Sequence, residues 1–502
     1  MDDCEALELL LTGLCESQTS NPDDAQRLLD LLAYLPLAIK QASAYMAKEQ
    51  VSISTYLEDF EAGQDNILEL LNEDFSDPHR YIGVQNPVAK TWLISFQHIA
   101  KRSPLAAEYL KFMSFLAAKD IPEFLLPPAR TMEIRKAVGT LKGYAFITQL
   151  AGQESFDMHR LVRLATQMWL KKNGQLEKYA KSATQRLDEK FPYPIIDNKD
   201  MWTKCLPHVQ AALEFRVPNT IPESKLSFKV ALCLMFLGHC RGAENQARIA
   251  VESCERLLGK ESPDTILSLH VLEKTLSSQG KFQETERIQR HSVKIRERVE
   301  GPGSPNTILS TIFLAETLRH QWKHRAAEEL ERRTVEVSDR FMGPRHPITL
   351  LSMRGLATAL FHQGKFAEAE KMYREMLMIQ ELEQGPEHPF TLLGVENLAI
   401  ALCRQGKYTE AEQMYRKTLK IHEREKGPEH PFTFLSIQGL ASALHRQEKF
   451  AEAEQMYRKT FEIQKRVQGP DHPHTLSSLR GLAAVLLRLG KVAELEWILS
   501  GS

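Results

Sequence analysis

The sequence predicts an all-α protein, most of which forms a right-handed superhelix of repeated helix pairs. The first observation is a glycine, a proline and a threonine that recur in this order six times, each set 42 residues after the previous one. The second is the helical spacing of apolar residues inside each period. A fixed period of this length is typical of units that stack and bury their apolar faces on one another. The six sets begin at Gly259, Gly301, Gly343, Gly385, Gly427 and Gly469.

The unit from Gly385 to Lys426 illustrates how each period is expected to fold. Gly385 ends the preceding helix, and Pro389 suits the first turn of the next one. From Thr391 to Gln405 apolar residues recur at steps of three and four, which predicts a first helix. Gly406 begins a tight turn, and a second amphipathic helix follows. We expect about seven such units over residues 217–502, the first of them degenerate.

This pattern resembles the tetratricopeptide repeat, in the 42-residue form found in kinesin light chains and in many fungal proteins. The resemblance is strongest from Asn306 to Gly490. It implies a superhelix whose first helices line a concave face, and therefore a protein or peptide partner. A cargo adaptor like kinesin light chain is one alternative, but that family carries a heptad coiled coil before its repeats and none is visible here.

Basic residues recur on the helices that should line this face. His320, His362, Arg404, Arg446 and Arg488 each stand two residues before a turn glycine or its equivalent. Arg354, Asn397 and Arg480 lie earlier in the same helices, and Asn397 resembles the asparagine that holds peptide backbone in this family. We expect these eight residues to form a partner-binding groove, because fixed guanidinium groups suit the carboxylates or phosphates of an extended peptide. Alternatively, the cations complement helix macrodipoles; the two roles are compatible.

Four repeated histidines are interpreted as turn residues. His346, His388, His430 and His472 occur once per unit, and no second ligand stands at short spacing. Metal sites need several ligands close together. We therefore predict no metal site.

Composition excludes several classes of function. Lys and Arg total 64 against 65 for Asp and Glu, so we expect neither nucleic acid nor a membrane surface as partner. No apolar run approaches the roughly 18 residues that span a bilayer. Seven cysteines without a C-x-x-C pair indicate reduced thiols and a cytoplasmic location. No H-E-x-x-H or G-x-S-x-G motif is present, so we expect a protein that is not an enzyme and has no catalytic residues.

The first 216 residues lack the period and are expected to form three parts: a helical region over 1–86, a winged-helix-like subdomain over 87–175 with a small β-hairpin near 145–158, and connecting helices over 176–216. Two motifs resemble those of NB-ARC nucleotide-binding domains. The stretch from Leu35 to Met46 is similar to their G-L-P-L-A segment, with Tyr34 where glycine is usual. Met158-His159-Arg160-Leu161-Val162 is similar to their M-H-D motif, with Arg160 in place of the aspartate.

The resemblance implies that His159 contacts the phosphates of ADP and that the winged helix acts as a lever rather than as a DNA reader. A G-x-x-x-x-G-K-[ST] phosphate loop is missing, so we expect no cofactor unless such a loop lies upstream, in which case ADP or ATP would bind. We expect an interaction scaffold or sensor, the C-terminal part of a signalling NB-ARC-type protein, whose partner is an acidic peptide if the arginines form a ladder. The alternative is a nucleotide-dependent switch that forms homo-oligomers in a longer form.

Overall fold

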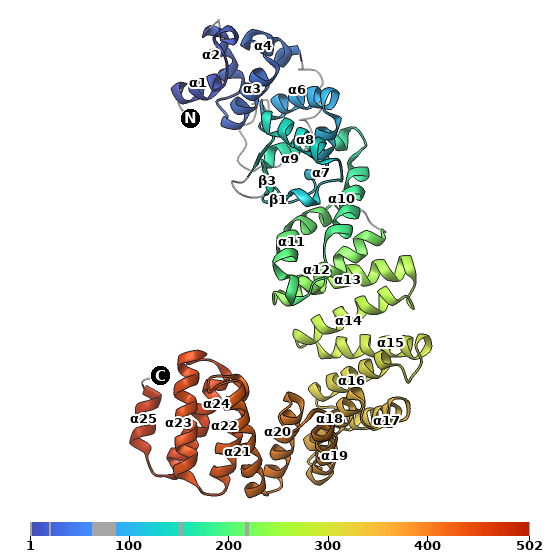
Figure 1. The fold of residues 1–502 in the computed structure, drawn as a ribbon, viewed down its shortest axis with the longest axis vertical. Coiled ribbons are helices and arrows are strands. Elements are labelled where there is room, and N and C mark those ends of the chain that lie inside the picture. The colour runs from blue at the N-terminus through green and yellow to red at the C-terminus, as the bar shows by residue number, and fades with distance from the viewer. Residues whose placement is uncertain (1–2, 20–21, 63–86, 150–153, 216–219, 501–502) are drawn as a thin grey trace. The chain divides into compact units, whose positions relative to one another are not determined.

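The computed structural model describes residues 3–19, 22–62, 87–149, 154–215 and 220–500 (Figure 1). Helices make up nearly all of its regular structure, which confirms the predicted all-α fold. The chain forms two compact units, Met1–Gln279 and Gly280–Ser502. The division falls inside the predicted repeats, because the first helix pairs belong to the same unit as the N-terminal region. The predicted boundaries at residues 86 and 216 lie outside the described residues.

Four helices begin the first unit, and Pro36 separates the middle two because it sits in the first turn of a helix and cannot continue one. Tyr34 has φ of +52°, a backbone conformation that glycine adopts most easily. That conformation explains why glycine is usual at this position of the motif that the segment resembles. The helices are α1 (Asp3–Leu11), α2 (Pro22–Leu31), α3 (Pro36–Glu49) and α4 (Ile53–Ala62).

The predicted hairpin is present as two strands of a small antiparallel sheet with the order β1-β3-β2. The sequence did not predict β1, which is two residues long. Asp157 holds it in place by accepting hydrogen bonds from the Lys119 ammonium (2.7 Å) and the Asp120 backbone N–H (2.8 Å). The hairpin turn at 150–153 lies outside the described residues. The strands are β1 (Ile121–Pro122), β2 (Ile147–Gln149) and β3 (Ser155–Met158).

Helices surround this sheet and share with it one apolar core that includes Trp92, Phe156 and Trp202, each almost fully buried. These helices are α6 (Pro87–Arg102), α7 (Pro104–Met113), α8 (Thr131–Gly143), α9 (Arg160–Lys172), α10 (Leu176–Lys190) and α11 (Lys199–Leu213). The unit ends with the first repeat helices, α12 (Ile221–Phe236), α13 (Cys240–Leu258) and α14 (Pro263–Ser278).

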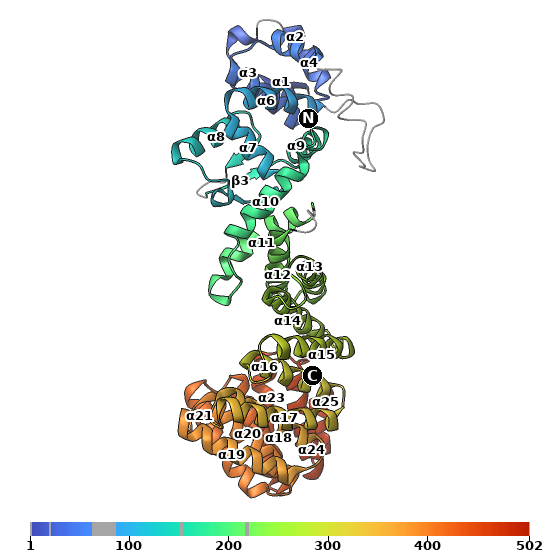
Figure 2. The same cartoon turned by 90° about the vertical axis from the view of Figure 1, so that its right-hand side faces the viewer.

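The second unit is a superhelix of alternating first and second helices (Figure 2). The first helices are α16 (Pro305–His320), α18 (Pro347–His362), α20 (Pro389–Arg404), α22 (Pro431–Arg446) and α24 (Pro473–Arg488). The second helices are α15 (Phe282–Val299), α17 (His324–Met342), α19 (Phe366–Gln384), α21 (Tyr408–Glu425), α23 (Phe450–Val467) and α25 (Val492–Ser500).

The repeated G-P-x-H-P-x-T residues build the turn into each first helix. Gly427 has φ of +88°, so the chain can reverse there at little steric cost. The His430 Nδ1 atom accepts a hydrogen bond from the Phe432 backbone N–H and thereby caps α22. The Thr433 hydroxyl donates to the Gly427 carbonyl at 2.8 Å. His346, His388 and His472 cap their helices in the same way, so all four histidines have a structural role at the turn.

Candidate functional site

The first helices form the inner layer of the second unit. Helices α16 and α18, α20 and α22, and α22 and α24 pack directly on one another. Neighbouring second helices are bridged instead by long side chains, such as Arg332 to Glu368 (3.1 Å) and Arg374 to Glu410 (2.6 Å). Because the first helices approach one another more closely, they lie on the concave side of the superhelix.

The five basic residues predicted at the ends of these helices occupy equivalent places. Each is the last residue of a first helix, and each side chain is exposed: His320, His362, Arg404, Arg446 and Arg488. They therefore follow the edge of the concave layer where each first helix turns into the second. The rings of His320 and Phe282 stack at a centroid distance of 4.9 Å, and those of His362 and His324 at 5.3 Å.

The three arginines of this edge are electrostatic neighbours. Burial raises the pKa of the Cys403 thiol, and the charges of Arg404 and Arg446 oppose that shift. Burial lowers the pKa of His445, and the charges of Arg446 and Arg488 lower it further. Consecutive arginines thus act on a common side chain, as a ladder of one cation per repeat requires.

In the part of the chain that the structure describes, the arginines on four of the five inner helices have no acidic partner, whereas on the fifth, α16, Arg319 contacts Glu331. Within the described residues, none of the arginines on the inner helices α18, α20, α22 and α24 forms an ion pair. On the outer helices, by contrast, Arg374 contacts both Glu370 and Glu410, and Arg416 contacts Glu412 and Glu452. The inner arginines without an ion pair are Arg354, Arg404, Arg446, Arg480 and Arg488.

Arg354, Arg480 and Asn397 occupy less uniform surroundings. Arg480 is exposed, whereas Arg354 and Asn397 are half-buried. The Asn397 amide has no hydrogen-bond partner among the residues that the structure describes. It therefore keeps donors and an acceptor available on the face where the resemblance places a peptide-binding asparagine.

The glycines that recur at the position of Asn397 have a packing role that the sequence did not reveal. A Cβ atom at Gly439 would lie 2.3 Å from the Tyr415 ring, and one at Gly481 would lie 2.4 Å from the Tyr457 ring. These glycines make room for a side chain of the preceding second helix.

The opposite edge of the concave layer carries two exposed phenylalanines, which sequence reasoning missed; charged residues (Glu387, Glu425 and Lys426) also line the pocket between them. Phe390 and Phe432, in the first turns of α20 and α22, are 58% and 45% exposed. They line a pocket of about 240 Å³ together with Leu393 and the buried Glu396 and His422. The recurring H-P-F-T segment was the available signal, but a phenylalanine in a helix is more often part of the core.

Second helices carry a further repeated feature, an ion-pair network that includes Glu328. Its carboxylate accepts hydrogen bonds from Arg332 in the same helix and from Gln363 and Lys365 in the turn of the next repeat. Burial alone would raise the pKa of Glu328, but these hydrogen bonds outweigh it and lower the pKa to about 2. The partners are satisfied by one another, so we assign the network to stability rather than to binding.

His159 lies at the start of α9 in the first unit and is exposed. Its Nδ1 atom accepts a hydrogen bond from the Leu161 backbone N–H at 3.2 Å, so the histidine caps the helix. Burial, and secondarily the charge of Lys119, lower the pKa of His159. The ring is therefore neutral at pH 7 and has its Nε2–H available for another contact.

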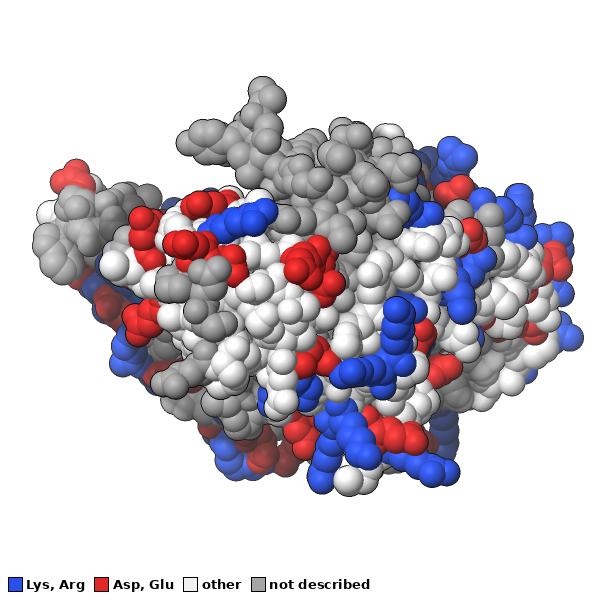
Figure 3. Space-filling model, turned by 90° about the horizontal axis from the view of Figure 1, so that it is seen from above, with Lys and Arg blue, Asp and Glu red and all other residues white. Residues whose placement is uncertain are grey.

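The face seen in Figure 3 carries charged side chains of both signs. In the view of Figure 3, Lys and Arg side chains are interspersed with Asp and Glu side chains. Among the described residues, no helix combines the length and apolar character of a membrane-spanning segment.

Comparison with known proteins identifies the repeats. One tetratricopeptide repeat family matches residues 274–340, 389–465 and 433–494, and a second matches residues 349–390. A nucleotide-binding leucine-rich repeat (NLR)-like protein of Hyaloscypha variabilis is 41% identical over 277 residues, which are 54% of this chain and 28% of that protein. The chain thus matches less than a third of the length of this relative.

Two solved structures are similar to part or nearly all of the chain. The TPR-like repeats of a candidate kinesin light chain from Podosopora anserina are 25% identical, with a TM-score of 0.38 over 40% of this chain and 95% of that one. A STAND protein with a tetratricopeptide repeat sensor from Pyrococcus horikoshii is 12% identical, with a TM-score of 0.43 over 98% of this chain and 70% of that one.

Proposed function

We propose that the concave face of this chain binds an acidic peptide segment of a protein partner. The premise is that the chain is a tetratricopeptide repeat protein related to NLR-like, NB-ARC–tetratricopeptide proteins. The chain is a protein-interaction scaffold. Its specific role would be that of a sensor, in which the repeats bind the partner and the N-terminal region relays or restrains the response.

The single observation that carries the proposal is the set of inner-layer arginines without an acidic partner. A guanidinium group that already holds a carboxylate has little to gain from a ligand, whereas these groups can donate several charge-assisted hydrogen bonds. Arg404, Arg446 and Arg488 repeat along one edge, which suits an extended peptide with acidic side chains at intervals. Each exposed contact would contribute roughly 0.5–1 kcal/mol.

The edge with Phe390 and Phe432 adds a second requirement for the ligand. Phe390 lies in the first turn of α20 and Arg404 ends it, so the two edges lie about 21 Å apart at 1.5 Å per residue. A segment that first crosses the face and then follows the arginine edge would place an apolar side chain between Phe390 and Phe432 and its carboxylates near the arginines. Asn397 lies between the edges and would hydrogen-bond the peptide backbone.

His159 is proposed as a phosphate contact in a nucleotide-bound form of the first unit, where its Nε2–H would donate to an ADP oxygen. Nucleotide-dependent oligomerisation is a separate property from peptide binding. The concave face lies in the second unit, and peptide binding there requires no nucleotide.

The test is a titration with a fluorescein-labelled peptide of twelve residues, rich in glutamate and carrying one phenylalanine. We expect Arg404→Glu/Arg446→Glu/Arg488→Glu to weaken binding about a hundredfold or more, because three attractive contacts become repulsive. The matched control is Lys417→Glu/Lys420→Glu/Lys459→Glu, which changes the net charge equally at exposed positions of the outer layer. Equal weakening by both variants would show that net charge, and not the concave face, determines binding.

A further inference from the structure

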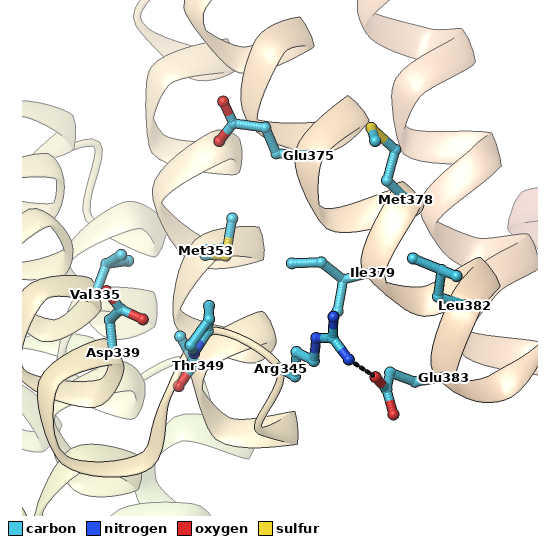
Figure 4. A pocket seen from close by; sticks show the side chains of 11 residues that line it. Val335, Asp339, Arg345, Thr349, Met353, Glu375, Met378, Ile379, Leu382 and Glu383 are labelled. Carbon is cyan, nitrogen blue, oxygen red and sulfur yellow. Dashed lines mark hydrogen bonds and ion pairs between the residues drawn. The ribbon is translucent and has the colours of Figure 1, made fainter.

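A second surface, on the outer layer, has the properties of a docking groove. It lies between α17 and α19, with α18 as its floor, and encloses about 420 Å³. Figure 4 shows Val335 and Asp339 on one wall, Met353 on the floor, and Met378, Ile379 and Leu382 along α19. All of these residues belong to the second unit.

Two exposed apolar side chains distinguish this groove from the same place in other repeats. Met378 is 65% exposed and Leu382 is 77% exposed. The residues at the position of Met378 in other second helices are Lys294, Glu336, Lys420 and Glu462, and those at the position of Leu382 are Arg298, Arg340, Arg424 and Arg466. Helices α15, α17, α21 and α23 thus all have charged side chains at the two positions where α19 has apolar ones. Exposed apolar side chains that gather in this way mark interaction sites.

The rim of the groove is acidic. Asp339, Glu375 and Glu383 line it, and its single lining cation, Arg345, is held by Glu383 at 3.1 Å. Glu375 lies 4.0 Å from the exposed Lys371 of the same helix. Helix α19 as a whole has five glutamates against one lysine and one arginine. A ligand of this surface must therefore combine an apolar face with positive charge.

One wall of the groove is about two helical turns long. The lining residues of α19 run from Glu375 to Glu383 on one stripe, a length of about 12 Å at 1.5 Å per residue. We propose that this groove binds a basic amphipathic helix of a protein partner, whose apolar face covers Met378 and Leu382 and whose cations pair with Asp339 and Glu375. Helices recognised in apolar grooves have this amphipathic character, and methionine adapts readily to such ligands. The site lies on the opposite layer from the acidic-peptide face and does not depend on it.

The test uses Met378→Lys/Leu382→Glu in the full chain. In the next repeat, Lys420 stands at the position of Met378. A glutamate at position 382 would face Arg345, as Arg424 faces Glu387 in the next repeat (2.7 Å), with the two charges exchanged. The double change leaves the net charge unaltered and should leave the circular dichroism spectrum and the thermal midpoint nearly unchanged. The probe is a fluorescein-labelled 18-residue helix of leucine and lysine with its leucines on one face.

We expect saturable one-to-one binding of this probe, weakened at least tenfold by Met378→Lys/Leu382→Glu. The variant Val467→Lys, at a 48% exposed apolar residue of α23, should bind like the wild type. A scrambled peptide of the same composition, and a version with glutamate for lysine, should bind at least tenfold more weakly.

The proposal is overturned if the double variant binds the probe unchanged or if the scrambled peptide binds equally well. It is also overturned if sedimentation shows a wild-type dimer that the double variant abolishes, because a second copy would then be the occupant. The arginine variants of the concave face should bind this probe normally, so the two proposals fail separately.

Discussion

Lys365 follows Glu328 by 37 residues and donates a hydrogen bond to its carboxylate at 2.8 Å, joining the turn of one repeat to the second helix of the preceding one. The same contact recurs between Lys323 and Glu286, Lys407 and Glu370, Lys449 and Glu412, and Lys491 and Glu454, each at 2.7–2.8 Å. A repeat protein is stabilised through the interfaces between neighbouring units. This periodic contact is therefore a property of the whole superhelix rather than of one site.

We predict that Glu328→Gln lowers the free energy of unfolding by about 1–2 kcal/mol, because the charge-assisted hydrogen bonds from Arg332, Gln363 and Lys365 are weakened. Urea unfolding of both proteins at pH 7 measures the effect. The control is Glu329→Gln, which removes only an exposed pair with Arg333 and should cost less than about 0.5 kcal/mol. Equal losses in the two variants would contradict a special role for Glu328.

The same network predicts a loss of stability in acid. The pKa values of Glu286, Glu328 and Glu412 are lowered from 4.5 to about 2 by their hydrogen bonds, which outweigh burial. A carboxyl group with a lowered folded-state pKa stabilises the protein above its unfolded-state pKa and loses that contribution as the pH falls through the folded-state value. Urea unfolding at a series of pH values should show the difference between wild type and Glu328→Gln shrinking between about pH 4.5 and pH 2. A constant difference would disprove the linkage.

Trp322 occupies a backbone position that favours glycine. Its φ is +62°, and the equivalent residues Gly280, Gly364 and Gly406 have φ of +72° to +82°. Because the Trp322 side chain is 82% exposed, its removal sacrifices little packing. We predict that Trp322→Gly raises the free energy of unfolding by about 0.5–1 kcal/mol, the relief of left-handed strain less the greater chain entropy of glycine. Thermal unfolding should show a higher midpoint for Trp322→Gly than for the wild type. Trp322→Ala should show no increase, because it removes the ring but keeps the strain.

The sequence predicted the helix pairs because proline, glycine and apolar spacing act within a few residues of one another. It could not predict the link from Glu328 to Lys365, since a spacing of 37 residues has meaning only after the superhelix brings the two together. That Arg404 has no acidic partner likewise depends on which acids lie near it in space, and its guanidinium group lies instead over the Phe361 ring. The exposed Phe390 and Met378 were missed for a related reason, because an apolar residue in a helix does not reveal whether a neighbouring helix covers it.

Gly439 offers a test of the packing between repeats. A methyl group there would lie 2.3 Å from the Tyr415 ring, so Gly439→Ala must displace a buried aromatic side chain. We predict that Gly439→Ala lowers the free energy of unfolding by about 1–3 kcal/mol, the usual cost of overpacking. The double variant Gly439→Ala/Tyr415→Ala should lose less stability than the sum of the two single variants, because the alanine methyl occupies space that the ring has left. Strict additivity in urea unfolding would show that the two residues do not compete for the same space.

ADP binding by this chain should be weak or absent. The sequence lacks the glycine-rich loop and lysine that supply most of the phosphate contacts in nucleotide sites, and His159 can donate one hydrogen bond at most. Isothermal titration at micromolar ADP should therefore show no saturable heat. Micromolar binding that disappears in His159→Ala would contradict the prediction and would favour the nucleotide-dependent switch instead.

The arginine ladder has two possible roles, and one triple variant separates them. If Arg404, Arg446 and Arg488 serve to complement the helix macrodipole, Arg404→Glu/Arg446→Glu/Arg488→Glu removes three cations from helix C-termini and adds three anions. Each exposed exchange would then cost roughly 0.3–1 kcal/mol and lower the thermal midpoint by several degrees. If the ladder exists to bind a ligand, the loss appears in affinity for the acidic peptide and the midpoint changes little. We expect mainly the second result, because each side chain lies at the exposed edge of the concave layer, where water and salt screen the dipole. A variant that is clearly destabilised yet binds the peptide as well as the wild type would assign the arginines to helix stability.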